Sequence, residues 1–83
     1  MYNYIPKALY DSLLARAKAD VLDSKATLQI YFENSAGIGE HPQHTEEMAK
    51  LLDKMATAED RVSVLQRHFK EIYGDIKNEP KKR

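Results

Sequence analysis

Two long segments without glycine or proline, separated by a short glycine-containing stretch, constrain the fold of this chain more than any other feature. Residues 7–35 and 43–73 lack both residues and are rich in alanine, leucine, lysine and glutamate, which favour helices. The stretch between them contains two of the three glycines. Neither segment has the strict alternation of a β-strand. The sequence therefore predicts an all-α protein, an antiparallel hairpin of two helices.

The expected ends of the helices follow from residues that favour helix termini. Pro6 suits a first helical turn, Gly37 suits a residue just past a helix end, and Pro42 suits the start of a second helix. Acidic residues then follow near the positive end of that helix. We expect a single domain, residues 1–83, with a helix at about 7–35, a corner at 36–41, a helix at about 42–76 and a basic tail at 77–83.

Apolar residues in both segments recur at alternating steps of three and four, a heptad pattern that places them on one stripe of each helix. In the first helix this stripe also contains the small residues Ala17 and Ser24, which allow a neighbouring helix to approach closely. We expect the hairpin seam to be formed by Leu14, Val21, Leu28, Tyr31, Met55, Val62, Leu65 and Phe69.

The first helix carries a second apolar face, well away from the seam. It consists of Ala15, Ala19, Leu22, Ala26 and Ile30, which cluster at helical spacing. A chain of 83 residues buries only a modest core by itself. We therefore expect this face to pair two hairpins into a homodimeric four-helix bundle. The alternative is a hairpin that docks onto another protein.

Composition argues against several classes of protein. There is no cysteine, and 13 basic residues balance 13 acidic ones, so neither thiol chemistry nor a broad basic face for nucleic acid is expected. The apolar runs are far shorter than the ~20 residues of a membrane span. No known catalytic arrangement emerges. We expect a cytoplasmic protein that is not an enzyme and needs no cofactor.

Two features leave other functions open. His41 and His44, three residues apart beside acidic residues, could contribute to a metal-binding bundle, although a protein site usually needs three or four ligands. Solvent-exposed histidines at a helix start are the simpler interpretation. The last three residues, Lys81, Lys82 and Arg83, could serve a small nucleic-acid-associated regulator, although three charges at a chain end give only weak, salt-sensitive attraction.

Three stretches within residues 10–70 resemble known proteins: the alanine-rich "LLARAKADVLDSKATLQIYF", the corner "GIGEHP" and the closing "LQRHF". On these stretches the chain resembles small helical proteins encoded by tailed phages, particularly marine ones. The resemblance implies a phage-encoded helical hairpin acting in the host cytoplasm or the virion, with a larger phage or host assembly as a further partner. It implies no activity and assigns no functional residues. The expected function is that of a non-enzymatic, self-associating interaction or structural protein.

Overall fold

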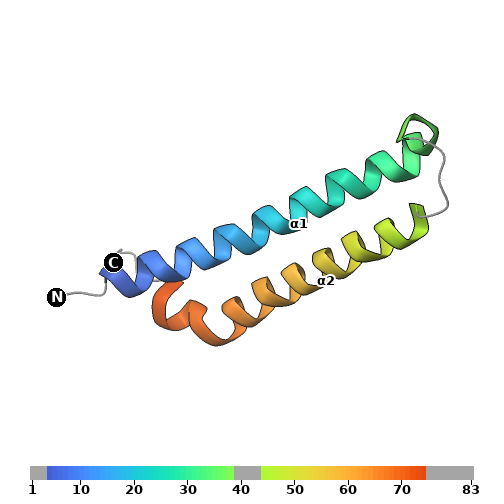
Figure 1. Cartoon of the computed structure of the whole chain (residues 1–83). Helices are drawn as coiled ribbons and strands as arrows, with labels where there is room; N and C mark the ends of the chain where they lie inside the picture. The colour runs from blue at the N-terminus through green and yellow to red at the C-terminus, as the bar shows by residue number, and fades with distance from the viewer. Residues whose placement is uncertain (1–3, 39–43, 75–83) are drawn as a thin grey trace.

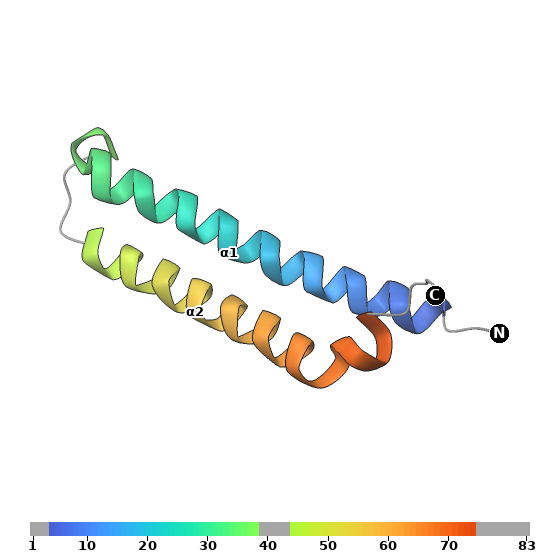
Figure 2. The same cartoon turned by 180° about the vertical axis from the view of Figure 1, so that it is seen from behind.

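The computed structural model describes residues 4–38 and 44–74 and contains two long helices and a short terminal turn. Helix α1 spans Tyr4–Ile38, helix α2 spans His44–Phe69, and the π-helical turn η1 spans Lys70–Gly74. The two helices lie side by side and run in opposite directions (Figures 1 and 2). The described part of the chain contains no strand. The expected all-α hairpin is therefore confirmed, as a rod of 58 × 19 × 18 Å.

The break at the end of α1 lies at Asn34. Its backbone has φ −147° and ψ 45°, which separates the last turn from the regular helix. Asparagine favours such positions because its side chain competes for backbone hydrogen bonds. The sequence placed the helix end at about residue 35 and Gly37 just beyond it, whereas the structure keeps Gly37 within α1. The expected corner at 36–41 and the start at Pro42 lie largely outside the described residues.

The end of α2 also differs from the expected continuous helix to residue 76. The α-helix stops at Phe69, and η1 turns back toward the first turns of α1 at the end of the hairpin opposite the connection (Figure 1). We call this the open end. A π-helical turn widens the helix by one residue, so the heptad stripe does not continue across it. Ile72, three residues after Phe69, is accordingly 54% exposed.

The core between the helices is narrow and built largely from small residues. The side chains buried among the described residues are Tyr10, Ala17, Ser24, Leu28 and Ala58. Four of them come from α1, and three of these, Ala17, Ser24 and Leu28, belong to the stripe that the heptad pattern identified. Because alanine and serine are short, the two helices pack closely in the middle of the hairpin. The larger apolar side chains lie along the edges of this contact.

Candidate interaction surfaces

The residues predicted to form the seam differ in how deeply their side chains are buried. Leu28 is buried. Six others are half-buried along the contact between the helices: Leu14, Val21, Tyr31, Met55, Val62 and Leu65. The last, Phe69, is 40% exposed and stacks on Tyr73 with ring centroids 6.3 Å apart. Phe69 therefore lies at the edge of the seam, where α2 gives way to η1.

Ser24 occupies the most enclosed position in the seam. Its side chain is completely buried, and its Oγ atom has no hydrogen-bond partner within the described part of the chain. A buried hydroxyl without a partner is unfavourable. Its small size is nevertheless what the position requires, because a larger side chain would separate the helices. Ser24 is thus a packing residue.

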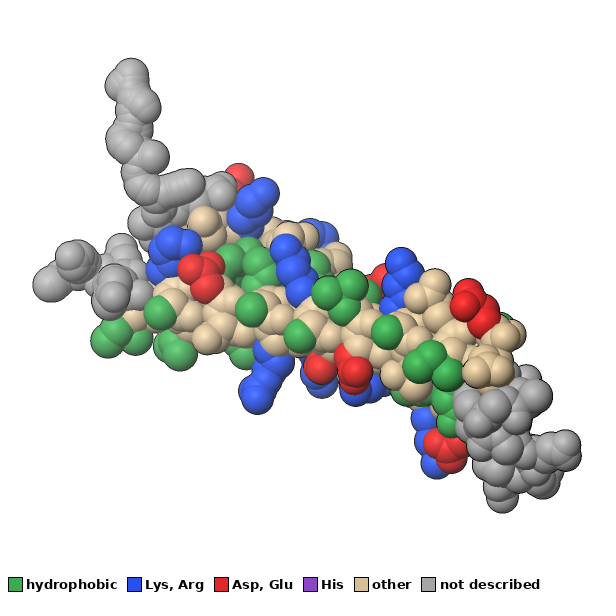
Figure 3. All heavy atoms as spheres, turned by 90° about the horizontal axis from the view of Figure 1, so that it is seen from above, with side chains coloured by type: hydrophobic (Ala, Val, Ile, Leu, Met, Phe, Trp, Pro, Cys, Tyr) green, Lys and Arg blue, Asp and Glu red, His purple; other side chains and the backbone are tan. Residues whose placement is uncertain are grey.

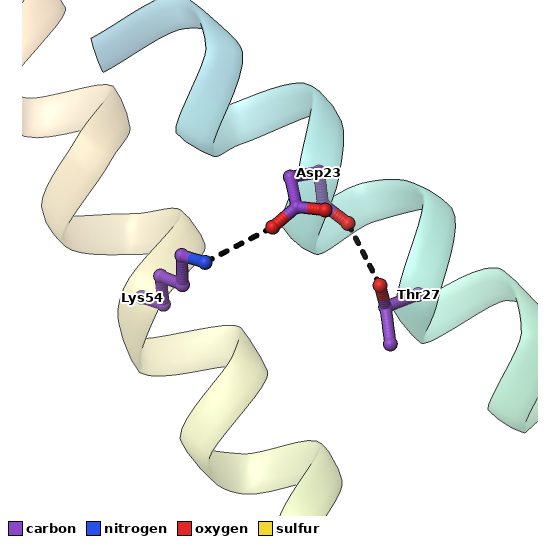
Figure 4. Close-up of polar contacts among 3 residues, drawn as sticks. All are labelled: Asp23, Thr27 and Lys54. Atoms are coloured by element: carbon purple, nitrogen blue, oxygen red, sulfur yellow. Dashed lines mark hydrogen bonds and ion pairs between the residues drawn. The ribbon is translucent and has the colours of Figure 1, made fainter. Parts of the chain in front are cut away.

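One ion pair joins the two helices across the surface of the hairpin. Lys54 Nζ on α2 donates to Asp23 Oδ2 on α1 at 3.1 Å (Figure 4). The hydroxyl of Thr27 donates to the backbone carbonyl of Asp23 at 3.0 Å. The other ion pairs of the described residues, Lys7–Asp11 and Lys50–Glu47, each lie within one helix. Asp23 therefore marks the point where polar side chains tie α1 to α2.

The second apolar face of α1 is exposed along its whole length. Its five predicted members, together with Ala8 and Ser12, form what we call the outer face: Ala8, Ser12, Ala15, Ala19, Leu22, Ala26 and Ile30, all exposed. Leu22 is 66% exposed and Ile30 54%. At helical spacing these residues lie opposite the buried stripe. Figure 3 shows hydrophobic side chains following the length of the rod, with charged side chains at the edges.

A groove at the open end was not anticipated from the sequence. It has a volume of about 280 Å³ and is lined almost entirely by apolar side chains: Pro6, Leu9, Tyr10, Leu13, Leu65, Phe69 and Tyr73. It adjoins a groove of about 420 Å³ that shares Leu13 and Leu65 and has charged walls formed by Arg16, Asp20, Asp60 and Arg61. The spacing of Leu9 and Leu13, outside both stripes, was the signal in the sequence that could have revealed it.

The histidines considered as metal ligands do not form a described cluster. His41 lies outside the described residues. His44 is half-buried and meets the ring of Tyr31 edge-on, with centroids 5.8 Å apart and an interplanar angle of 83°. Within residues 4–38 and 44–74, no three histidine or acidic side chains gather in a way that could hold a metal ion. The packing of His44 on Tyr31 places it at the end of the seam where α1 connects to α2.

The function of this chain is inferred from the geometry of the hairpin. No family model, curated protein or solved structure matches this chain. Neither α1 nor α2, as described, contains an apolar segment long enough to cross a bilayer. The basic residues 81–83 lie outside the described part of the chain. The exposed outer face and the two grooves are therefore the surfaces on which an interaction could be built.

Proposed function

We propose that this chain is a self-associating helical interaction protein, in which two hairpins pair through the outer face of α1. Because this face lies opposite α2, the pair sets the two α1 helices side by side between the two α2 helices, in place of the compact four-helix bundle expected from the sequence. One observation carries the proposal. A continuous row of uncharged side chains, from Ala8 to Ile30, is exposed on the side of α1 that faces away from α2. Leucine and isoleucine on such a row favour burial against another apolar surface.

The composition of the hairpin core supports this proposal. Of the five buried side chains in the described residues, three are alanine or serine, which contribute little apolar area. The large apolar side chains of the outer face, Leu22 and Ile30, are instead more than half exposed. A domain of this size depends on using its apolar surface efficiently. Pairing two copies buries surface that one hairpin leaves in water.

The dimensions of the outer face indicate a reversible contact. From Ala8 to Ile30 the helix rises about 33 Å, and a strip about 10 Å wide gives on the order of 330 Å² for each copy. The pair would bury roughly 700 Å² in total, below the ~1,200 Å² of a typical stable interface. The edges of the strip add to this area. We therefore expect a dimer that dissociates on dilution.

Sedimentation velocity over a wide range of concentration tests the proposal. We expect the mass to rise from one chain to two, and Leu22→Glu on the outer face to shift that rise to much higher concentration. Leu52→Glu is the matched control, because Leu52 is also an exposed leucine, at 58%, but lies on α2 away from this face. A monomer at every concentration, or equal weakening by both variants, would rule out the proposed interface.

The resemblance to tailed-phage proteins motivates the biological part of the proposal, an accessory or virion-associated role. Such a protein would act by burying its helical faces against itself and within a larger assembly. Mass spectrometry of purified virions and of lysate fractions from infected cells tests this role. Detection of the chain only as a free species in the lysate would contradict membership of an assembly.

A further inference from the structure

We infer that two copies pair α1 against α1 in antiparallel orientation, with a two-fold axis passing beside Ala19. This inference rests on the proposed self-association and adds the geometry of the contact. Ala19 lies at the centre of the outer face, with its side chain exposed. A two-fold axis perpendicular to the two helices makes the contact self-complementary. Residues equally far from Ala19 in opposite directions along the sequence then lie level with each other across the interface.

The sizes of the side chains match under this axis. Ala8 and Ile30 each lie eleven residues from Ala19, and Ser12 and Ala26 each lie seven residues from it. Each large residue of the outer face therefore meets a small one: Ile30 meets Ala8 of the second copy, and Leu22 lies within one residue of the level of Ala15. At the centre, alanine meets alanine, so the helices can approach closely.

Charges at one edge of the outer face also match. Arg16 lies three residues before Ala19 and Asp23 four residues after it, and their seven-residue spacing puts them on the same edge of the helix. A perpendicular two-fold axis brings equivalent edges together. Arg16 then lies within about 1.5 Å of the level of Asp23 of the second copy, and the pair occurs twice. The Asp23 side chain is 66% exposed while bound to Lys54. Its carboxylate can accept hydrogen bonds from Lys54 and from Arg16 of the second copy at the same time.

A parallel pairing of the same faces is less well matched. It would set Ala8 against Ala8 and Ile30 against Ile30, leaving space at one end of the contact and crowding at the other. It would also bring opposite edges together, which places Arg16 beside Lys18 of the second copy. The antiparallel pairing brings Lys18 near Lys18 of the second copy, a repulsion comparable to that between Arg16 and Lys18 and weakened by salt in the same way, but it gains the two attractive Arg16–Asp23 pairs. Size and charge therefore both favour a second copy in antiparallel orientation.

Cysteine cross-linking tests this geometry directly, because the chain has no cysteine of its own. A disulfide needs Cα atoms within about 7 Å of each other. On mild oxidation we expect Ala19→Cys to form a covalent dimer. Ala8→Cys and Ile30→Cys should not cross-link alone but should cross-link with each other when mixed. Leu52→Cys on α2 is the control for random collision.

The outcomes separate this inference from the proposed function. If Ala8→Cys and Ile30→Cys each cross-link with themselves as readily as Ala19→Cys does, the pairing is parallel and the inference fails, although self-association stands. If the chain dimerises and Ala19→Cys does not cross-link above the Leu52→Cys control, the axis lies elsewhere. If sedimentation shows only a monomer, both proposals fail.

Charge reversal provides a second test. Arg16→Asp and Asp23→Arg should each raise the dimer dissociation constant by about tenfold at low salt. The variant with both changes should recover most of that loss, because it restores each pair with the signs exchanged. Lys54→Ala measures the separate effect of losing the ion pair within the hairpin. Circular dichroism checks that each variant remains helical, and failure of the double variant to recover would contradict the proposed contact.

Discussion

The ring of Tyr10 lies against the backbone of Gly74, so that a β-carbon added at Gly74 would stand 3.0 Å from Tyr10 Cε2 and 3.2 Å from Tyr10 Cζ. Tyr10 is 5% exposed. Its burial therefore depends on η1 turning back over α1 with a residue that has no side chain. This contact packs the last described residue, in η1, against the first turns of α1 at the open end of the hairpin.

Gly74→Ala should destabilise the hairpin, because the added methyl group requires Tyr10 or Lys70 to move; Lys70 Cγ would be 3.1 Å from the new atom. We expect a cost of about 1 kcal/mol, in the range of mild overpacking. In a Tyr10→Leu background the same change should be neutral or slightly stabilising, since alanine is the better helix former. Thermal unfolding at fixed protein concentration measures both. An equal effect in the two backgrounds would show that Tyr10 is not the obstacle.

Ser24→Ala should stabilise the protein. The substitution removes a buried hydroxyl without a partner, which carries a desolvation cost of about 1–3 kcal/mol. Ser12→Ala is the matched control, because Ser12 is an exposed serine on the same helix and gains only helix propensity, about 0.5 kcal/mol. Urea unfolding should give the larger gain for Ser24→Ala. A loss of stability would instead mean that the hydroxyl is hydrogen-bonded in the folded protein.

The periodicity of the sequence was sufficient to predict the hairpin and its close central contact. Ala17, Ser24 and Leu28 fall on the predicted stripe and are buried. The same periodicity placed Ala19 and Leu22 on a separate face, and both are exposed. Such features depend only on the angle between successive residues around a helix, which the sequence specifies directly.

The features at the two ends of the hairpin could not be predicted in this way. The turn at 70–74 depends on the contact of Tyr10 with Gly74, between residues far apart in the sequence. The helix break falls at Asn34, whereas glycine at position 37 is the residue type that more commonly follows a helix end. The groove lined by Leu9 and Phe69 follows from the bend into η1. A heptad pattern contains no information about these contacts.

Leu28→Ala should cost the hairpin more than any other leucine truncation in the seam. Leu28 is 7% exposed, and Leu→Ala at a buried position typically costs about 2–5 kcal/mol. Leu65 is half-buried, so Leu65→Ala should cost about half as much. Leu52→Ala, at a 58% exposed site, should change stability by less than about 0.5 kcal/mol. Chemical unfolding at one concentration orders the three variants, and a Leu65→Ala cost above that of Leu28→Ala would place the core elsewhere.

The ion pair between Asp23 and Lys54 should contribute little to stability despite its 3.1 Å distance. Both side chains are about half exposed or more, and exposed pairs are worth about 0–1 kcal/mol because water and mobile side chains weaken them. A double-mutant cycle with Asp23→Ala and Lys54→Ala isolates the coupling between the two residues. Its value should decrease further at high salt, where exposed charges are screened.

Lys50→Ala, which removes a cation paired within α2, is the control for general charge effects. The cycle is measured at a dilution where the hairpin is monomeric, and there a coupling well above 1 kcal/mol that persists at high salt would contradict this prediction.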